Sequence, residues 1–168
     1  IRRWKNGELY SKDSIKVNDS LKYKTIKGRT VYGGGGIIPD VFVPYDTSMN
    51  SNLLFAILSK NLIRNYAVKF YTSKKIKGFD YEEAIQKLDS SKIILSFEAF
   101  CKTKEVYWSE KDWNTSKEYI VNKLYASVLS IKFGNNAYLK KSAEIDKDIK
   151  KALEVFSLSD NGITFEPE

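Results

Sequence analysis

The chain has 168 residues, of which 42% are hydrophobic, 14% aromatic and 29% charged. This length and composition suit one domain, or a domain with part of another, and argue against disordered or low-complexity architecture. Lysine and arginine number 28 against 21 aspartates and glutamates, a net charge of +7, and there is no histidine. Triads and metal sites that need an imidazole are therefore excluded for this chain.

A single cysteine, Cys101, excludes an internal disulfide. Its place in the apolar run 93–101 predicts a small, buried side chain. No apolar stretch approaches the roughly 20 residues of a membrane span. Because the sequence starts at Ile1, without an initiator methionine or a signal-peptide pattern, we expect it to be a piece of a longer protein.

The first 47 residues have the pattern of strands and turns. Asn6-Gly7 is a tight-turn pair of the kind that needs a positive φ. Residues 23–32 alternate β-branched or aromatic side chains with polar ones around Lys27-Gly28, which predicts two short strands joined by a turn. Residues 37–44 predict a further short strand. Prolines lie near both of its ends, which suits an edge strand or the end of a strand better than a central strand.

From Ser48 onward the hydrophobic period becomes helical. One long helix is predicted to end near Thr72, on the stripe Leu54, Leu58, Leu62, Tyr66 and Phe70. Asp80 and Glu83 form a capping-box pattern that predicts a short helix through about Leu88. Residues 92–102 have helical spacing, although Ile93-Ile94-Leu95 also suits a strand.

Two more helices complete the predicted elements. Thr115 and Glu118 resemble another capping box, opening a helix that Gly134 stops. The last helix carries Ile145, Ile149, Leu153 and Phe156. No internal repeat of fixed period is visible. The expected fold class is α+β and mostly helical, with a β-rich segment over 1–47 and about five helices over 48–168.

The positive charge lies in the first two-thirds of the chain: residues 1–48 carry +4, residues 49–104 carry +5 and residues 105–168 carry −2. Basic charge with exposed aromatics can bind single-stranded nucleic acid. The lysines, however, alternate with carboxylates, and many aromatics occupy apolar helix positions. This pattern favours solvated helix faces and an ordinary core, so no nucleic-acid partner is expected.

The run Gly33, Gly34, Gly35 and Gly36 has the flexible backbone of a phosphate loop. No Gly-Lys-Ser/Thr follows it, and a strand with Pro39 and Asp40 comes next instead of a helix. The glycines are therefore interpreted as allowing a sharp turn and a close backbone approach, with Asp40 accepting bonds from nearby amides. We predict no cofactor and no metal.

A serine-lysine hydrolase needs no histidine. No serine here is followed three residues later by lysine, and none lies in a Gly-x-Ser-x-Gly elbow. The chain therefore offers no catalytic residue that the sequence can identify.

Residues 19–44 resemble the end of the catalytic core in the C-terminal processing (tail-specific) peptidases, in particular the Bacteroidetes-type branch. The matching positions are Tyr23, Thr25, Gly28, Arg29, Gly34, Gly36, Ile37, Pro39, Asp40 and Val43. The resemblance implies a serine endopeptidase with a Ser-Lys dyad and a PDZ domain. It also implies a protein exported to the periplasm or cell envelope, acting on polypeptides with unstructured C-termini.

In that family the dyad and the PDZ domain lie upstream, so the resemblance implies that this chain alone is inactive. Residues 1–47 would be the incomplete end of the peptidase core and residues 48–168 a helical accessory domain. The core-closing structural motif would be Gly28, Arg29, Gly33, Gly34, Gly35, Gly36, Pro39 and Asp40.

Two alternative functions remain open. One is a non-enzymatic binding module that docks a protein partner or an acidic surface through its basic face. The other is a structural tail that supports the core or self-associates.

Overall fold

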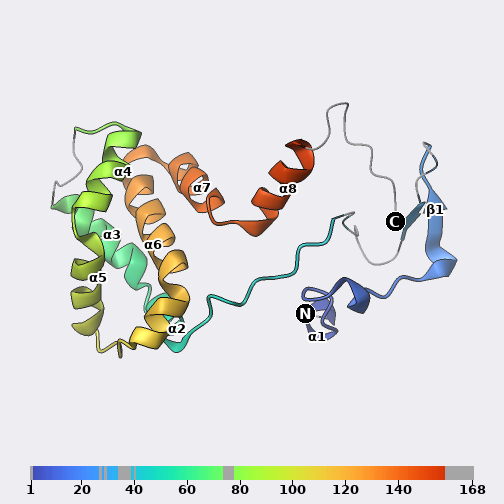
Figure 1. Ribbon diagram of the computed structural model, residues 1–168, viewed down its shortest axis with the longest axis horizontal. Coiled ribbons are helices and arrows are strands. Elements are labelled where there is room, and N and C mark those ends of the chain that lie inside the picture. The colour runs from blue at the N-terminus through green and yellow to red at the C-terminus, as the bar shows by residue number, and fades with distance from the viewer. Residues whose placement is uncertain are drawn as a thin grey trace. The chain divides into compact units, whose positions relative to one another are not determined.

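The computed structural model describes residues 2–26, 28, 30–33, 39, 41–73 and 78–157. The chain divides into two compact units (Figure 1). The N-terminal unit comprises Ile1–Asp46 together with Lys147–Glu168, and the helical unit comprises Thr47–Asp146. The boundary lies one residue from the expected one, but the last helix is grouped with the N-terminal unit.

The N-terminal unit contains the predicted hairpin. β1 (Lys22–Lys24) pairs antiparallel with β2 (Thr30–Tyr32), with Tyr23 opposite Val31. α1 (Arg2–Lys5), two 3-10 turns at Lys12–Ser14 and Asp19–Leu21, and α8 (Lys147–Ser157) complete the unit. Residues 41–47 form neither helix nor strand, so the strand predicted over 37–44 is wrong in that part. Gly34–Ile38 and Asp40 lie outside the described residues.

The helical unit contains α2 (Asn52–Ser59), α3 (Leu62–Thr72), α4 (Tyr81–Ser90), α5 (Ile93–Lys102), α6 (Glu110–Phe133) and α7 (Asn135–Ala143). α6 is central and contacts α2, α3, α4 and α7 (Figure 1). The prediction of a mostly helical chain with a short β segment near its start is confirmed. Seven described helices follow residue 47, however, where about five were expected.

The long helix predicted to end near Thr72 is two helices. α2 ends at Ser59, and Asn61 adopts the left-handed conformation, with φ of 51° and ψ of 35°, before α3 begins. Asparagine tolerates this conformation better than most residues. The apolar stripe continues across the break, so the period alone did not reveal it.

The helix starts depend on local capping. The predicted box at α4 is confirmed: the Glu83 amide donates to Asp80 Oδ1 and the Asp80 amide to Glu83 Oε2, both at 2.9 Å. The box predicted at Thr115 is wrong, because the N-cap of α6 is Ser109, six residues earlier, whose hydroxyl accepts from the Asp112 amide at 3.3 Å. Gly134, with φ of 83°, ends α6 as predicted, and the unexpected α7 follows directly.

The core of the helical unit is aliphatic and aromatic, and Cys101 is fully buried in it as predicted. Tyr66 is its aromatic centre. The Tyr66 ring lies 5.3 Å from the ring of Phe97, edge to face, and 5.3 Å from that of Phe100. Because α3 carries Tyr66 and α5 carries both phenylalanines, these rings join the two helices.

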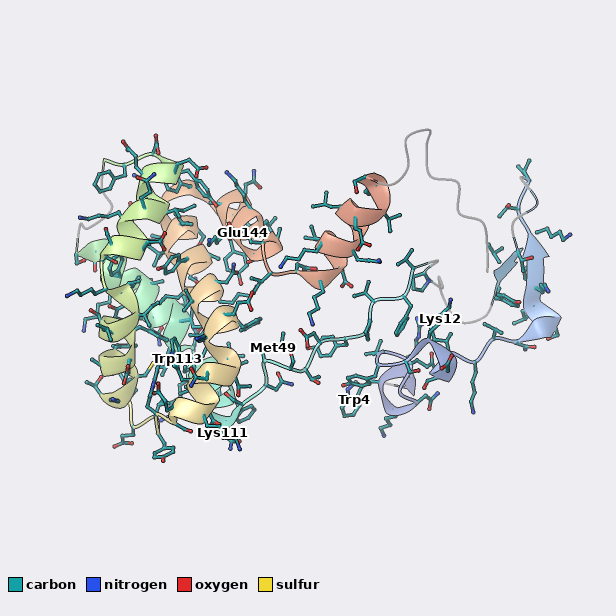
Figure 2. The ribbon with its side chains drawn as sticks, in the orientation of Figure 1. Trp4, Lys12, Met49, Lys111, Trp113 and Glu144 are labelled. Carbon is teal, nitrogen blue, oxygen red and sulfur yellow. The ribbon has the colours of Figure 1, made fainter. Side chains whose placement is uncertain are left out.

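A buried hydroxyl network joins α2 to the first turns of α6. The fully buried Ser116 hydroxyl donates to the Met49 carbonyl at 2.6 Å and accepts from the Ser51 hydroxyl at 2.7 Å. Ser51 in turn caps α2 by accepting from the Leu54 amide at 3.1 Å. Figure 2 shows Met49 beside this end of α6, where Trp113 also lies. Every polar atom of this network has a partner, so its burial is compensated.

The helical unit contains two helical pairs of the same design, which the sequence did not reveal. The first pair is α2–α3 and the second is α4–α5. Positions 31 residues apart have the same role: Asn61 and Lys92 both adopt the left-handed conformation between the helices, with φ of 51° and 52°. The buried equivalents are Leu53 and Ala84, Ile57 and Leu88, Leu62 and Ile93, Tyr66 and Phe97, Phe70 and Cys101.

Side-chain hydrogen bonds follow the same 31-residue spacing. The hydroxyls of Ser59 and Ser90 each donate to the carbonyl three residues back, both at 3.2 Å. Thr72 and Thr103 do the same at 2.9 and 2.7 Å. Few side chains are identical between the pairs, so the repeat lies in burial and backbone conformation.

Candidate functional site: a lysine groove

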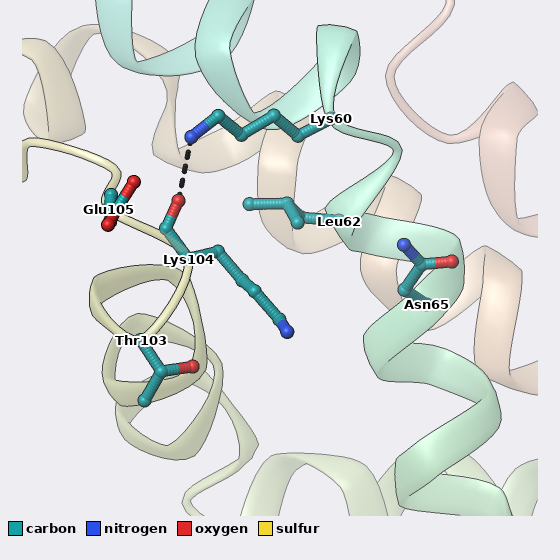
Figure 3. A pocket seen from close by; sticks show the side chains of 6 residues that line it. All are labelled: Lys60, Leu62, Asn65, Thr103, Lys104 and Glu105. Carbon is teal, nitrogen blue, oxygen red and sulfur yellow. Dashed lines mark hydrogen bonds between the residues drawn. The ribbon is translucent and has the colours of Figure 1, made fainter.

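The candidate site is an open groove between the start of α3 and the turn that follows α5 (Figure 3). Its volume is about 440 Å³, within the range of sites that hold small ligands or single side chains. The lining residues, which define the lysine groove, are Lys60, Leu62, Asn65, Thr103, Lys104 and Glu105.

Two backbone turns build the groove. On one side, left-handed Asn61 separates Lys60 from α3. On the other, α5 ends in a Schellman motif: the Val106 amide donates to the Cys101 carbonyl at 3.3 Å and the Glu105 amide to the Lys102 carbonyl at 3.1 Å. Glu105 has φ of 56° in this motif, a position that favours glycine. Non-glycine residues in such conformations are often found where a site requires them.

The two sides are joined by one direct bond. The Lys60 ammonium donates to the Lys104 carbonyl at 2.7 Å, as Figure 3 shows. This bond uses one of the three ammonium protons, so two remain for a ligand. Lys60 is thereby held at the rim of the groove by a neutral partner.

The groove has uncompensated positive charge. The Lys104 ammonium lies 5.8 Å from the centre of the Phe100 ring, and that of Lys69 lies 5.4 Å from it. Among the described residues, none of the ammonium groups of Lys60, Lys69 and Lys104 pairs with a carboxylate. Glu105 is the one acidic residue in the lining and is exposed. An anion placed in the groove would therefore meet more positive than negative charge.

Three other lysines of the helical unit do pair with carboxylates. Lys102 pairs with Glu98 at 2.6 Å, Lys140 with Glu82 at 3.3 Å, and Lys141 with Glu144 at 2.7 Å. The charge of these three lysines is compensated within the fold, whereas Lys60, Lys69 and Lys104 contact a carbonyl or an aromatic face. Lys123, which contacts the Ser142 hydroxyl and two tyrosine rings, resembles the second group.

The groups whose pKa values are shifted lie in the core, away from this chemistry. Burial raises the pKa of the Cys101 thiol to about 12, so the thiol is protonated and weakly nucleophilic at neutral pH. Burial, with a hydrogen bond to Asp89, also raises the pKa of Tyr125 to about 12. For Tyr66, burial raises the pKa and the hydrogen bond with Ser96 partly opposes this.

Within the described residues, no three histidine, cysteine, aspartate or glutamate side chains gather in an arrangement that could hold a metal ion. None of the described helices combines the length and apolar character needed to cross a bilayer.

The sequence-predicted motif is only partly described. Gly28 has φ of 82°, as the predicted turn requires. The Gly33 amide donates to the Leu21 carbonyl at 2.8 Å, and a Cβ there would lie 3.0 Å from the Tyr23 ring, so the backbone at Gly33 lies close to both residues. Pro39 is exposed. The remaining members, Arg29, Gly34, Gly35, Gly36 and Asp40, lie outside the described residues.

Sequence reasoning missed the groove residues. Lys60 and Lys104 were among many lysines interpreted as solvated, and 44 positions separate them. Each lysine lies in a polar run that the sequence shows: Ser-Lys-Asn at 59–61 inside an otherwise apolar helix pattern, and Thr-Lys-Glu at 103–105 after α5. Neither run indicates that Lys60 and Lys104 contact one another in the fold.

The fold and groove define a small helical domain with a cationic surface opening. Residues 53–134, just under half of the chain, match a family of unknown function, DUF8443. This match covers most of α2–α6 and both sides of the lysine groove. No curated protein and no solved structure matches the chain.

This result corrects the resemblance to C-terminal processing peptidases. No peptidase family matches any part of the chain, and the family found lies over the helices instead of residues 19–44. The resemblance was carried by glycines, prolines and short turn motifs, which recur wherever a chain turns sharply. The inferred upstream dyad, the PDZ domain, the tail-bearing substrates and the envelope location rested on the resemblance and lose that support.

Proposed function

We propose that the helical unit, residues 47–146, is a non-enzymatic binding module that docks an acidic partner protein through the lysine groove. The observation that carries the proposal is the grouping of ammonium groups that have no carboxylate partner among the described residues: Lys60 and Lys104 line the groove, and Lys69 approaches the same Phe100 ring as Lys104. A partner carboxylate would supply the missing counter-charge.

The groove is held by structure that does not depend on a ligand. Leu62 and Cys101, on its two sides, are buried in the core, and the Lys60 to Lys104 bond ties the sides together. A preformed site loses less conformational entropy on binding than a flexible one. This rigidity supports a docking role for the groove.

The charge in the groove favours attraction at long range and orientation at short range. Cationic surfaces accelerate encounter with acidic partners, and the effect weakens as salt screens it. Binding through the groove is therefore expected to weaken between 50 and 300 mM salt, concentrations chosen to span the physiological value.

The test uses the full chain and a fluorescein-labelled glutamate-rich peptide, with binding followed by fluorescence anisotropy. The double variant Lys60→Gln and Lys104→Gln removes two charges while glutamine at position 60 keeps a donor for the Lys104 carbonyl. Loss of two charge-assisted contacts is expected to weaken binding about tenfold.

The matched control is the double variant Lys87→Gln and Lys117→Gln, which removes the same charge from exposed positions on α4 and α6. It is expected to weaken binding less than about twofold. Circular dichroism checks that all variants fold. Equal losses in both double variants, or no binding by the parent chain, would contradict docking at the groove.

A further inference from the structure

We infer that the lysine groove recognises a peptide segment, through an acidic side chain and the adjoining backbone, in preference to a phosphate polymer. The inference rests on the proposed function and specifies its ligand. It follows from the two neutral polar side chains of the lining, Thr103 and Asn65, and from the apolar surface beside the lysines.

The Thr103 hydroxyl can accept a hydrogen bond from a ligand but cannot donate one to it. Its hydroxyl donates to the Phe100 carbonyl at 2.7 Å, and a hydroxyl has only one proton. The oxygen facing a ligand can therefore only accept. A peptide N–H satisfies such an acceptor, whereas a phosphodiester oxygen carries no proton to donate.

Asn65 complements this arrangement. Among the described residues, none hydrogen-bonds to its side-chain amide, which keeps one acceptor and two donors for a ligand. A peptide unit offers one N–H and one C=O, the matching set. Figure 3 shows Asn65 and Thr103 on opposite sides of the groove, with the Lys104 side chain extending between them.

The apolar part of the site lies beside the lysines. Phe100 is partly buried against the core, and its ring is approached by Lys69 and Lys104. The lysine stems and the partly buried ring provide an apolar surface next to the charges. A segment in which glutamate or aspartate adjoins an apolar residue would use both, and polyglutamate would use the charge alone.

The absence of arginine from the lining supports the same class of ligand. Phosphate recognition commonly uses the planar fork of arginine, which binds two oxygens at once. Both cations of the lining are lysines, which act as point charges and suit a single carboxylate together with backbone contacts.

The experiment measures the parent chain by anisotropy against three labelled probes. The first is the peptide Gly-Leu-Glu-Leu-Gly-Leu-Glu-Leu-Gly, the second has both glutamates replaced by glutamine, and the third is a short oligothymidylate of at least equal negative charge. We expect the glutamate peptide to bind at least fivefold more tightly than either of the others. Equal or tighter binding of oligothymidylate would overturn the inference and indicate a phosphate site.

The 31-residue repeat supplies the matched variants. Thr103→Val and Thr72→Val remove equivalent hydroxyls, which make the same bond to the carbonyl three residues back, but only Thr103 lines the groove. Thr103→Val should weaken binding of the glutamate peptide about fivefold, as the loss of one hydrogen bond implies, and Thr72→Val should leave it unchanged.

The outcomes separate the inference from the proposed function. If the double variant of Lys60 and Lys104 loses binding while Thr103→Val and Thr72→Val behave alike, the groove binds acidic partners by charge alone and the peptide-specific reading fails. If the lysine variant binds as the parent does, the proposed function fails first. Thermal unfolding of each variant shows that a loss of binding is not a loss of fold.

Discussion

The two helical pairs share five buried positions and differ at the surface. Five equivalent pairs of buried side chains, the left-handed residues Asn61 and Lys92, and the bonded hydroxyls follow one spacing. The groove lysines do not: the positions equivalent to Lys60 and Lys104 are Ser91 and Ser73. Since α4–α5 has serine in place of Lys60, and α2–α3 has serine in place of Lys104, neither lysine is required by the shared design. The difference therefore separates residues that hold the helices from residues available for binding.

The largest effect is expected from truncating Tyr66 and Phe97, which tests whether the two helical pairs are equivalent in the core. Tyr66→Ala and Phe97→Ala should each reduce the free energy of unfolding by about 3–5 kcal/mol, because each leaves a cavity where the two rings pack against one another. Leu95→Ala, at a largely exposed position of α5, is the control and should change it by less than about 0.5 kcal/mol. Urea denaturation measures all three. A large loss from only one aromatic variant would break the equivalence.

A smaller effect on stability, which depends on pH, is expected from Cys101 of the second pair and not from Phe70, its equivalent in the first. The thiol has its ordinary pKa of 9.0 in the unfolded chain and a pKa of about 12 in the fold. Between these values the unfolded state binds fewer protons than the folded one, so stability falls as pH rises, by about 1.4 kcal/mol per pH unit for this one group. The loss is about 2 kcal/mol by pH 10.5.

Cys101→Ala removes this contribution. Urea denaturation at pH 8, 9 and 10 should show a shallower decline of stability for the variant than for the parent chain, whatever the offset at neutral pH. Tyr125, whose pKa is also about 12, adds a second decline above its ordinary value of 10 in both proteins. Parallel declines for parent and variant between pH 9 and 10 would contradict a buried, protonated thiol.

The smallest effect compares the two left-handed positions. Lys92→Gly should stabilise the chain by about 1 kcal/mol, because glycine adopts this conformation without the steric cost that lysine carries. This is a net value: the greater conformational entropy of glycine in the unfolded chain offsets part of the steric gain. Asn61→Gly should gain only a few tenths, since asparagine already tolerates it. Thermal unfolding ranks the two variants. A destabilising Lys92→Gly would show that the lysine side chain contributes packing that the backbone argument leaves out.

Much of the helical content was accessible from local pattern. The Asp80 and Glu83 box, the stop at Gly134 and the hairpin around Gly28 depend on neighbours within a few residues. The errors share a cause. At Asn61 the apolar stripe continues through a change of direction, and at Thr115 the cap pattern lies inside a helix that Ser109 had already started. In each case the sequence contained two local signals, one for a continuing helix and one for a helix end, and only the packed structure showed which of them holds.

The amino-acid order by itself determined most of the helical segments, the buried face of α3 on Leu62, Tyr66 and Phe70, and the absence of imidazole chemistry, because these depend on side-chain period and composition. Tertiary structure alone decided the break between α2 and α3, the 31-residue correspondence of the two helical pairs, and the meeting of Lys60 with Lys104. The last two features join positions far apart in the chain. Contacts of that kind arise only when the helices pack their apolar faces together and bring the turns at their ends side by side.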